Sequence, residues 1–286
     1  MSDLNITKSV LSISSPGPYL VHPYNVMARE TAKECNDFAA DLKERRPTQF
    51  GYWAVLPLPD VEGSLEELAR ALDEKNADGI ALATNAHGYY LGDPKFDPIF
   101  KELNARSAKV FLHPTAPSMV TSVGCLGCAP LPQYPFPIFE FFFDTARAVT
   151  NLFLSKTIEK YPHITYIIPH AGGCLPPLIQ RFCALPGMIG IDGVSEKDVK
   201  RQLKEQFYFD LAGFVFPDQI QGLLPYVTTK RLMYGSDYPY TPIDTVKEVS
   251  ANMEEDLPRV FNNRKDQQDI YHDNAARLLG DMPKEH

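Results

Sequence analysis

Short apolar runs alternate with amphipathic helical patterns along the whole chain. Each run has the length of a strand, and each is followed by a stretch whose apolar residues recur at helical spacing. The seven expected strands occupy residues 9–14, 49–58, 79–84, 109–115, 165–170, 207–212 and 231–237. The helices expected after them occupy residues 26–45, 64–75, 97–106, 139–161, 175–185, 218–227 and 241–253, and a last helix covers 269–279.

The stretch 64–75 shows how a helix is expected from the pattern. Leu65, Leu68 and Leu72 recur on one helical face. Ser64 precedes this run and Glu67 stands three residues later, which is the capping-box spacing. We therefore expect the helix to begin at Ser64.

Repeated strand–helix units predict a parallel sheet with helical crossovers. Both a doubly wound sheet and a barrel have this pattern, and the position of the polar residues distinguishes them. Three apolar runs give way at their carboxyl ends to His113, His170 and Asp237. Barrel enzymes assemble their sites from several strands at that rim. We therefore expect one α/β domain over residues 1–286, a TIM-type (β/α)8 barrel with seven of its strands present, and a long irregular loop over residues 113–137.

Composition excludes several classes of partner. The formal net charge is −8 and there is no basic block, so no nucleic acid is expected to bind. No apolar run approaches the ~20 residues of a membrane span, so no membrane partner is expected. The amino terminus lacks a secretory signal pattern, and five cysteines do not form an even disulfide framework. A cytoplasmic protein is therefore expected.

Two histidines at strand ends are candidates for chemistry. A neutral imidazole at His113 can bind a divalent metal, and the alternative is a histidine that hydrogen-bonds a neighbouring carbonyl. His170 is followed by Gly172 and Gly173, which permit a tight turn into the next helix. At the amino end of that helix an acid–base histidine is favoured over a packing one.

Three further residues are candidates for the same site. Asp237, in the turn "YGSDYP", is a possible metal ligand or base, and the alternative is a turn that caps the next helix. Arg181 lies about three helical turns after His170 and is a possible clamp for a substrate carboxylate. The alternative for Arg181 is a solvated helix residue. His87, after the strand at 79–84, is a candidate substrate contact.

Four ordered motifs carry a family resemblance: "FLHPTAP", "YIIPHAGGCLPPLIQRF", "FYFDLAGFVFP" and "LMYGSDYPYTP". With them the chain resembles the amidohydrolase-related metal-dependent decarboxylases, which include aminocarboxymuconate-semialdehyde decarboxylase and fungal 6-methylsalicylate decarboxylases. The resemblance implies a (β/α)8 barrel with one divalent ion, zinc or manganese, and zinc is our expectation. It makes His113 a metal ligand, His170 the catalytic acid–base group, and Asp237 a ligand that takes part in proton transfer. It makes Arg181 a binder of the substrate carboxylate.

The family's first strand carries a D-x-H-x-H-like motif, and no such motif is found in this chain. We therefore expect the barrel to lack its first strand and the domain to be incomplete at its amino end.

The resemblance implies a carboxy-lyase that acts on a small aromatic or muconate-type acid, such as a 6-methylsalicylate-like compound, in secondary metabolism or aromatic catabolism. It also implies a homodimer. Two alternatives remain: a metal-dependent hydrolase of a lactone, ester or amide, and a catalytically degenerate member that only binds small molecules because two metal ligands are missing.

Overall fold

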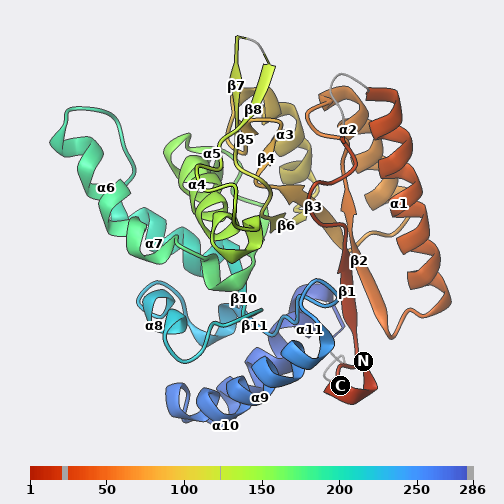
Figure 1. Ribbon diagram of the computed structural model, residues 1–286, viewed down its shortest axis with the longest axis vertical. Coiled ribbons are helices and arrows are strands. Elements are labelled where there is room, and N and C mark those ends of the chain that lie inside the picture. The colour runs from red at the N-terminus through yellow and green to blue at the C-terminus, as the bar shows by residue number, and fades with distance from the viewer. Residues whose placement is uncertain (21–24, 123, 282–286) are drawn as a thin grey trace. The chain divides into compact units, whose positions relative to one another are not determined.

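Figure 1 shows the computed structural model, which describes residues 1–20, 25–122 and 124–281. The chain divides into two units, Met1–Tyr166 and Ile167–His286. Within the described residues, no helix combines the length and the apolar composition needed to cross a bilayer.

The first unit is built on parallel strands that follow one another in the sheet in chain order. Its strands are β1 (Ser9–Ser12), β2 (Phe50–Val55), β3 (Gly79–Ala83) and β6 (Lys109–His113). In β2 five of six residues are buried in succession, as expected for a parallel strand covered on both faces. The register places His113 beside Ala83, so the ends of β3 and β6 meet at one edge.

Helices cover these strands in the first unit. They are α1 (Asn25–Arg45), α2 (Val61–Ala69), α3 (Asp97–Ala105), α4 (Glu140–Leu154) and α5 (Thr157–Lys160). The helix α1 packs on β2, and α2 lies against α1 and α3 (Figure 1). Large side chains such as Tyr52, Phe100 and Phe153 are almost completely buried in this unit.

The start of α2 differs from the sequence expectation. The observed N-cap, Asp60, lies four residues before the predicted cap, and its side chain accepts a hydrogen bond from the amide of Gly63. Ser64 lies inside the helix and is buried. Arg29 holds the Asp60 carboxylate at 2.5 Å, so a tertiary ion pair accompanies the cap.

Two antiparallel hairpins follow the strands that end at the shared edge. They pair β4 (Asn85–Ala86) with β5 (Tyr89–Tyr90) and β7 (Ser118–Thr121) with β8 (Gly124–Gly127). The second hairpin lies in the segment expected to be an irregular loop, and it projects from the rest of the first unit (Figure 1).

The second unit contains the remaining parallel strands. They are β9 (Thr165–Ile168), which crosses the boundary of the units, β10 (Phe207–Asp210) and β11 (Leu232–Met233). Its helices are α6 (Ile179–Met188), α7 (Glu196–Gln206), α8 (Gln219–Leu223), α9 (Ile243–Val260), α10 (Arg264–Gln268) and α11 (Asn274–Leu279). β10 pairs in parallel with β11, and residues such as Phe207, Phe209 and Leu203 form the buried core.

Short turns of helix complete the chain. They are 3-10 turns at Ser2–Leu4, Pro94–Phe96, Phe136–Ile138, His170–Gly172, Pro176–Leu178 and Thr229–Arg231, and π-helical turns at Arg70–Glu74 and Asp269–Asp273. The turn at His170–Gly172 contacts β10 and α8 within the second unit.

Candidate active site

A cavity of about 290 Å³ lies in the first unit, between residues 13–20, the ends of β2 and β3, and the segment after β6. Apolar side chains such as Leu56, Leu58 and Leu82 form one part of its wall. Its two histidines are His87 and His113, and no other acidic or basic residue is among the described residues that line it. The volume suits a single aromatic ring with small substituents.

His113 is the last residue of β6 and is half-buried at the cavity. Its Nδ1 lies 2.6 Å from the carbonyl oxygen of Pro114. A carbonyl only accepts, so Nδ1–H donates and the neutral ring carries its lone pair on Nε2. Metal-binding histidines are fixed in this way by a bond from the other ring nitrogen. The hydrogen bond to a neighbouring carbonyl is therefore confirmed, and it is also the arrangement that a ligand needs.

His87 contributes a second imidazole to the cavity wall. Its Nε2 donates to the carbonyl oxygen of Tyr19 at 2.8 Å, and the two rings meet edge to face at 5.0 Å. His87 therefore fastens the segment 13–20 to the wall. Its role as a substrate contact stays a prediction.

In the second unit, His170 lies two residues beyond the end of β9, in a left-handed conformation. The φ angles of His170 and Ala171 are 54° and 52°, which L-residues adopt only at a cost. Hydrogen bonds on both sides hold this backbone. The amide of His170 donates to Asp210 Oδ1 at 2.9 Å, and its carbonyl accepts from Gln219 Nε2 at 2.6 Å.

Asp210, the last residue of β10, is a site residue that the sequence reasoning missed. Its Oδ1 accepts from the amides of His170 and Ala212 at 2.9 and 3.1 Å. The residue keeps some exposed area, but its carboxylate lies deep among neighbouring atoms. Desolvation by burial raises the pKa of Asp210, and the charge of Asp237 raises it further, against the opposing effect of His170. The strand "FYFD" ends on a carboxylate as β6 ends on an imidazole, and that common position was the available signal.

Replacing Asp210 by asparagine is expected to remove part of the pH dependence of folding. The raised pKa means that the stability linked to this group is full below the unfolded value of 3.8 and is lost as pH rises through the folded value. Asparagine keeps an oxygen for both amides and does not ionise. The free energy of unfolding of the variant, relative to the native protein, should therefore increase from acid toward neutral pH. Urea titrations at several pH values measure it, and a difference that stays constant contradicts the raised pKa.

Asp237 lies four residues beyond β11, also in a left-handed conformation with φ 55°. Its Oδ2 accepts from the hydroxyl of Thr241 at 3.0 Å, and its carbonyl accepts from the amide of Thr241 at 2.9 Å. The following helix α9 has Pro242 as its N-cap, with no side-chain hydrogen bond there. Asp237 therefore closes a turn and does not cap the helix. Its negative charge contributes to the raised pKa of Asp210.

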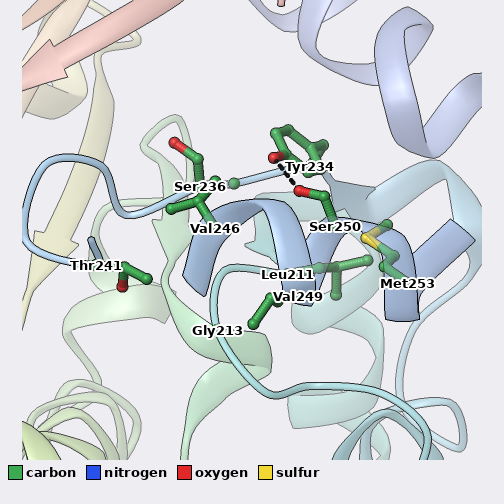
Figure 2. A pocket seen from close by; sticks show the side chains of 10 residues that line it. Leu211, Gly213, Tyr234, Ser236, Thr241, Val246, Val249, Ser250 and Met253 are labelled. Carbon is green, nitrogen blue, oxygen red and sulfur yellow. Dashed lines mark hydrogen bonds between the residues drawn. The ribbon is translucent and has the colours of Figure 1, made fainter. Parts of the chain in front are cut away.

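A small pocket in the second unit lies between the ends of β10 and β11 and the helix α9 (Figure 2). Gly213 and Ser236 line one side, and Val246 and Met253 line the helical side. The hydroxyl groups of Tyr234 and Ser250 lie 2.9 Å apart within it. Its volume of about 10 Å³ is close to that of one water molecule, so it does not hold an aromatic ring.

Arg181 is exposed on α6. Its expected contact with a substrate carboxylate stays a prediction.

Across the described residues, no three His, Cys, Asp or Glu side chains gather closely enough to form a metal site. The described donors have the right chemistry, because imidazole nitrogen and carboxylate oxygen are the usual ligands of zinc and manganese.

Comparison with known proteins identifies the family. Residues 20–280 match the family described as Amidohydrolase. The chain belongs to the amidohydrolase family. It is 34% identical to the 6-methylsalicylic acid decarboxylase of Aspergillus aculeatus over 259 residues, which cover 88% of this chain and 76% of that protein. The amidohydrolase resemblance stated from the four motifs is confirmed.

Solved structures confirm the fold class. A crystal structure described as an amidohydrolase II superposes with a TM-score of 0.83 at 32% identity, and covers 98% of this chain and 86% of that chain. The dihydroxybenzoic acid decarboxylase of Polaromonas sp., with bound manganese and 2-nitroresorcinol, superposes with a TM-score of 0.80 at 22% identity, over 98% of this chain and 83% of its own. The amidohydrolase-type barrel fold is therefore confirmed. The single domain over residues 1–286 and the missing first strand stay predictions.

Proposed function

We propose that this chain is a metal-dependent, non-oxidative decarboxylase of a small aromatic or muconate-type acid, such as a 6-methylsalicylate-like compound. The observation that carries the proposal is the 34% identity to the 6-methylsalicylic acid decarboxylase of Aspergillus aculeatus over 88% of this chain. The cavity in the first unit supports it, because its volume and apolar wall suit one substituted ring. Its role would lie in secondary metabolism or aromatic catabolism.

The proposed reaction breaks the bond between the ring carbon and the carboxylate. The electron pair of that bond stays on the ring carbon, carbon dioxide leaves, and a proton takes its place. His170 is the proposed donor of this proton, since its backbone is fixed on both sides by Asp210 and Gln219. Asp237 is the proposed partner in proton transfer, and Arg181 and His87 are the proposed substrate contacts.

We further propose one divalent ion, zinc or manganese, with His113 and Asp237 as ligands from this chain. The tautomer of His113 is fixed by its bond to Pro114, which leaves Nε2 as the nitrogen that carries the lone pair. When bound, the ion would stabilise the negative charge of the substrate. The manganese in the related structure from Polaromonas sp. supports a divalent ion of this kind.

The proposed partners are the carboxylic acid substrate and a second copy of the chain, in the cytoplasm. Residues 114–139 contain no charged side chain. Met119, Leu126 and Ile138 in this segment are exposed apolar residues, and Met119 and Leu126 lie opposite each other in the β7–β8 hairpin. A second copy would cover such a surface. Light scattering of the purified protein measures the number of copies.

The function is tested by adding 6-methylsalicylate to the purified protein loaded with zinc or manganese. We expect carbon dioxide and 3-methylphenol in equal amounts, because the proton replaces the lost carboxylate on the ring. A panel of salicylate-type and muconate-type acids defines the substrate class. Lactone or ester opening without gas release would show a hydrolase instead, and stoichiometric binding without turnover of any acid would show a binding protein.

A further inference from the structure

One fully buried carboxylate in the first unit has no role in the reaction proposed above. Asp144 lies on α4, and its side chain is 0% exposed. Its Oδ2 accepts hydrogen bonds from the hydroxyl of Thr84 and from Asn85 Nδ2, the latter at 3.1 Å. Its Oδ1 accepts from the hydroxyl of Tyr90, and Arg147 Nη1 lies 3.6 Å away. A single carboxylate thus orients the side chain that follows β3 and one side chain each from β4 and β5.

The two residues held by Oδ2 in turn hold the backbone around His113. The amide of Thr84 donates to the carbonyl of His113 at 2.9 Å, and the Thr84 hydroxyl oxygen accepts from the amide of Thr115 at 3.1 Å. Hydrogen bonds therefore hold the backbone at His113 and at Thr115, on either side of Pro114. The carbonyl of Pro114 is the group that fixes the imidazole of His113.

Asn85 forms further hydrogen bonds to the same segment. Its Nδ2 also donates to the carbonyl of Ala116 at 3.1 Å. Its Oδ1 accepts from the hydroxyl of Ser118 at 2.7 Å and from the amide of Gly88 at 3.2 Å, next to His87. Side chains that Asp144 orients therefore hold the backbone close to both histidines of the cavity, at Thr115 for His113 and at Gly88 for His87.

We infer that Asp144 is a positioning residue, which acts through Thr84 and Asn85 to set the orientation of His113 in the cavity. The inference rests on the proposed function only in assigning His113 to the metal. Stability alone does not account for the arrangement, because a buried carboxylate is costly to desolvate and an apolar residue fills such a place at a lower cost. Its hydrogen bonds lead to residues of the cavity wall, and a functional site needs such supporting bonds to keep its side chains in a precise orientation.

Two variants separate positioning from stability. Thr84→Val removes a donor to Oδ2 together with the acceptor for Thr115, while keeping the shape of the side chain. Tyr90→Phe removes a donor to Oδ1 and leaves in place the hydrogen bonds that Thr84 and Asn85 make to residues 113–118. Each variant takes one hydrogen bond from the same carboxylate, so each serves as the control of the other.

Thr84→Val is expected to lower kcat between about tenfold and a hundredfold, the cost of misplacing a reacting group by roughly an ångström. Tyr90→Phe should keep the native kcat. Asp144→Asn should retain most of kcat, because its single oxygen can accept from Thr84 and Asn85 while its amide turns to the Tyr90 oxygen. Two measurements do not depend on turnover: the exchange rate of the Thr115 amide proton and the affinity for Mn²⁺. The exchange rate should rise, and the Mn²⁺ affinity should fall, in Thr84→Val only.

Equal effects of Thr84→Val and Tyr90→Phe on exchange and on Mn²⁺ affinity, or no effect of either, would overturn the inference. A native protein that releases no carbon dioxide from any acid would instead refute the proposed function. The exchange and Mn²⁺ measurements would still decide whether the Thr84 side chain, which Asp144 holds, positions His113.

Discussion

Carbon dioxide release is expected to fall by about 10²–10⁴-fold when His170 is replaced by alanine, the usual contribution of a general acid. His170→Ala removes the imidazole and keeps the amide that donates to Asp210 and the carbonyl that accepts from Gln219. The turn should therefore keep its shape, because Ala171 beside it already adopts the same left-handed conformation. The loss would then be chemical, with kcat reduced and the melting temperature nearly unchanged.

The control for this variant is His163→Ala, which removes an exposed histidine outside the proposed site. It should leave kcat and the melting temperature at their native values. If His170→Ala keeps native turnover, the proton comes from another group. The raised pKa of Asp210 makes that carboxyl the next candidate, because burial allows it to hold a proton at a higher pH than an exposed aspartate.

The strands and most helices were predictable because parallel strands and amphipathic helices leave periodic patterns in the sequence. The observed strand β6 ends at His113 within the predicted run 109–115, and α1 covers 25–45 against a prediction of 26–45. The predicted start of α2 was wrong because Asp60 caps the helix, and Asp60 is held by Arg29, a residue 31 positions away. A local rule contains no information on such a partner.

The hairpin β7–β8 was missed for a similar reason. The segment contains many proline and glycine residues, which indicate a loop, whereas the pairing of Met119 with Leu126 gives it regular structure. Residues 113–118 are further held by Thr84 and Asn85. These contacts join parts of the chain that lie about thirty residues apart, as the spacing of 31 between Thr84 and Thr115 shows.

The candidate residues at strand ends were predictable, and the buried carboxylate of Asp144 was not. His113, His170 and Asp237 stand out because each interrupts an apolar run. Asp144 is located within a helix, where an acidic residue normally indicates a solvated face, and only the folded chain shows that it is buried. Its partners Thr84 and Tyr90 belong to segments 60 and 54 positions away. Hydrogen-bond networks of this kind are tertiary features.

Replacing His113 by alanine is expected to reduce the affinity for Mn²⁺ and Zn²⁺ by more than about tenfold. Mutating a residue that only hydrogen-bonds a metal ligand already lowers metal affinity by about 10–100-fold, and loss of the ligand itself should cost at least as much. The imidazole whose Nδ1 is tied to the Pro114 carbonyl is the nitrogen donor that this chain offers at the end of β6. Turnover should fall with metal occupancy and should recover only in part at high metal concentration. Calorimetric titration of the metal-free protein measures the affinity directly.

His87→Ala is the matched control, since His87 is also a half-buried imidazole in the same cavity wall. Its Nε2 already donates to the carbonyl of Tyr19, so we expect its removal to loosen the segment 13–20 and to raise KM while metal affinity stays native. A protein in which His87→Ala weakens metal binding and His113→Ala does not would reverse the two assignments. Because a ligand must be unprotonated to bind, the native affinity should also decline as the solution is acidified, and His113→Ala should abolish part of that decline.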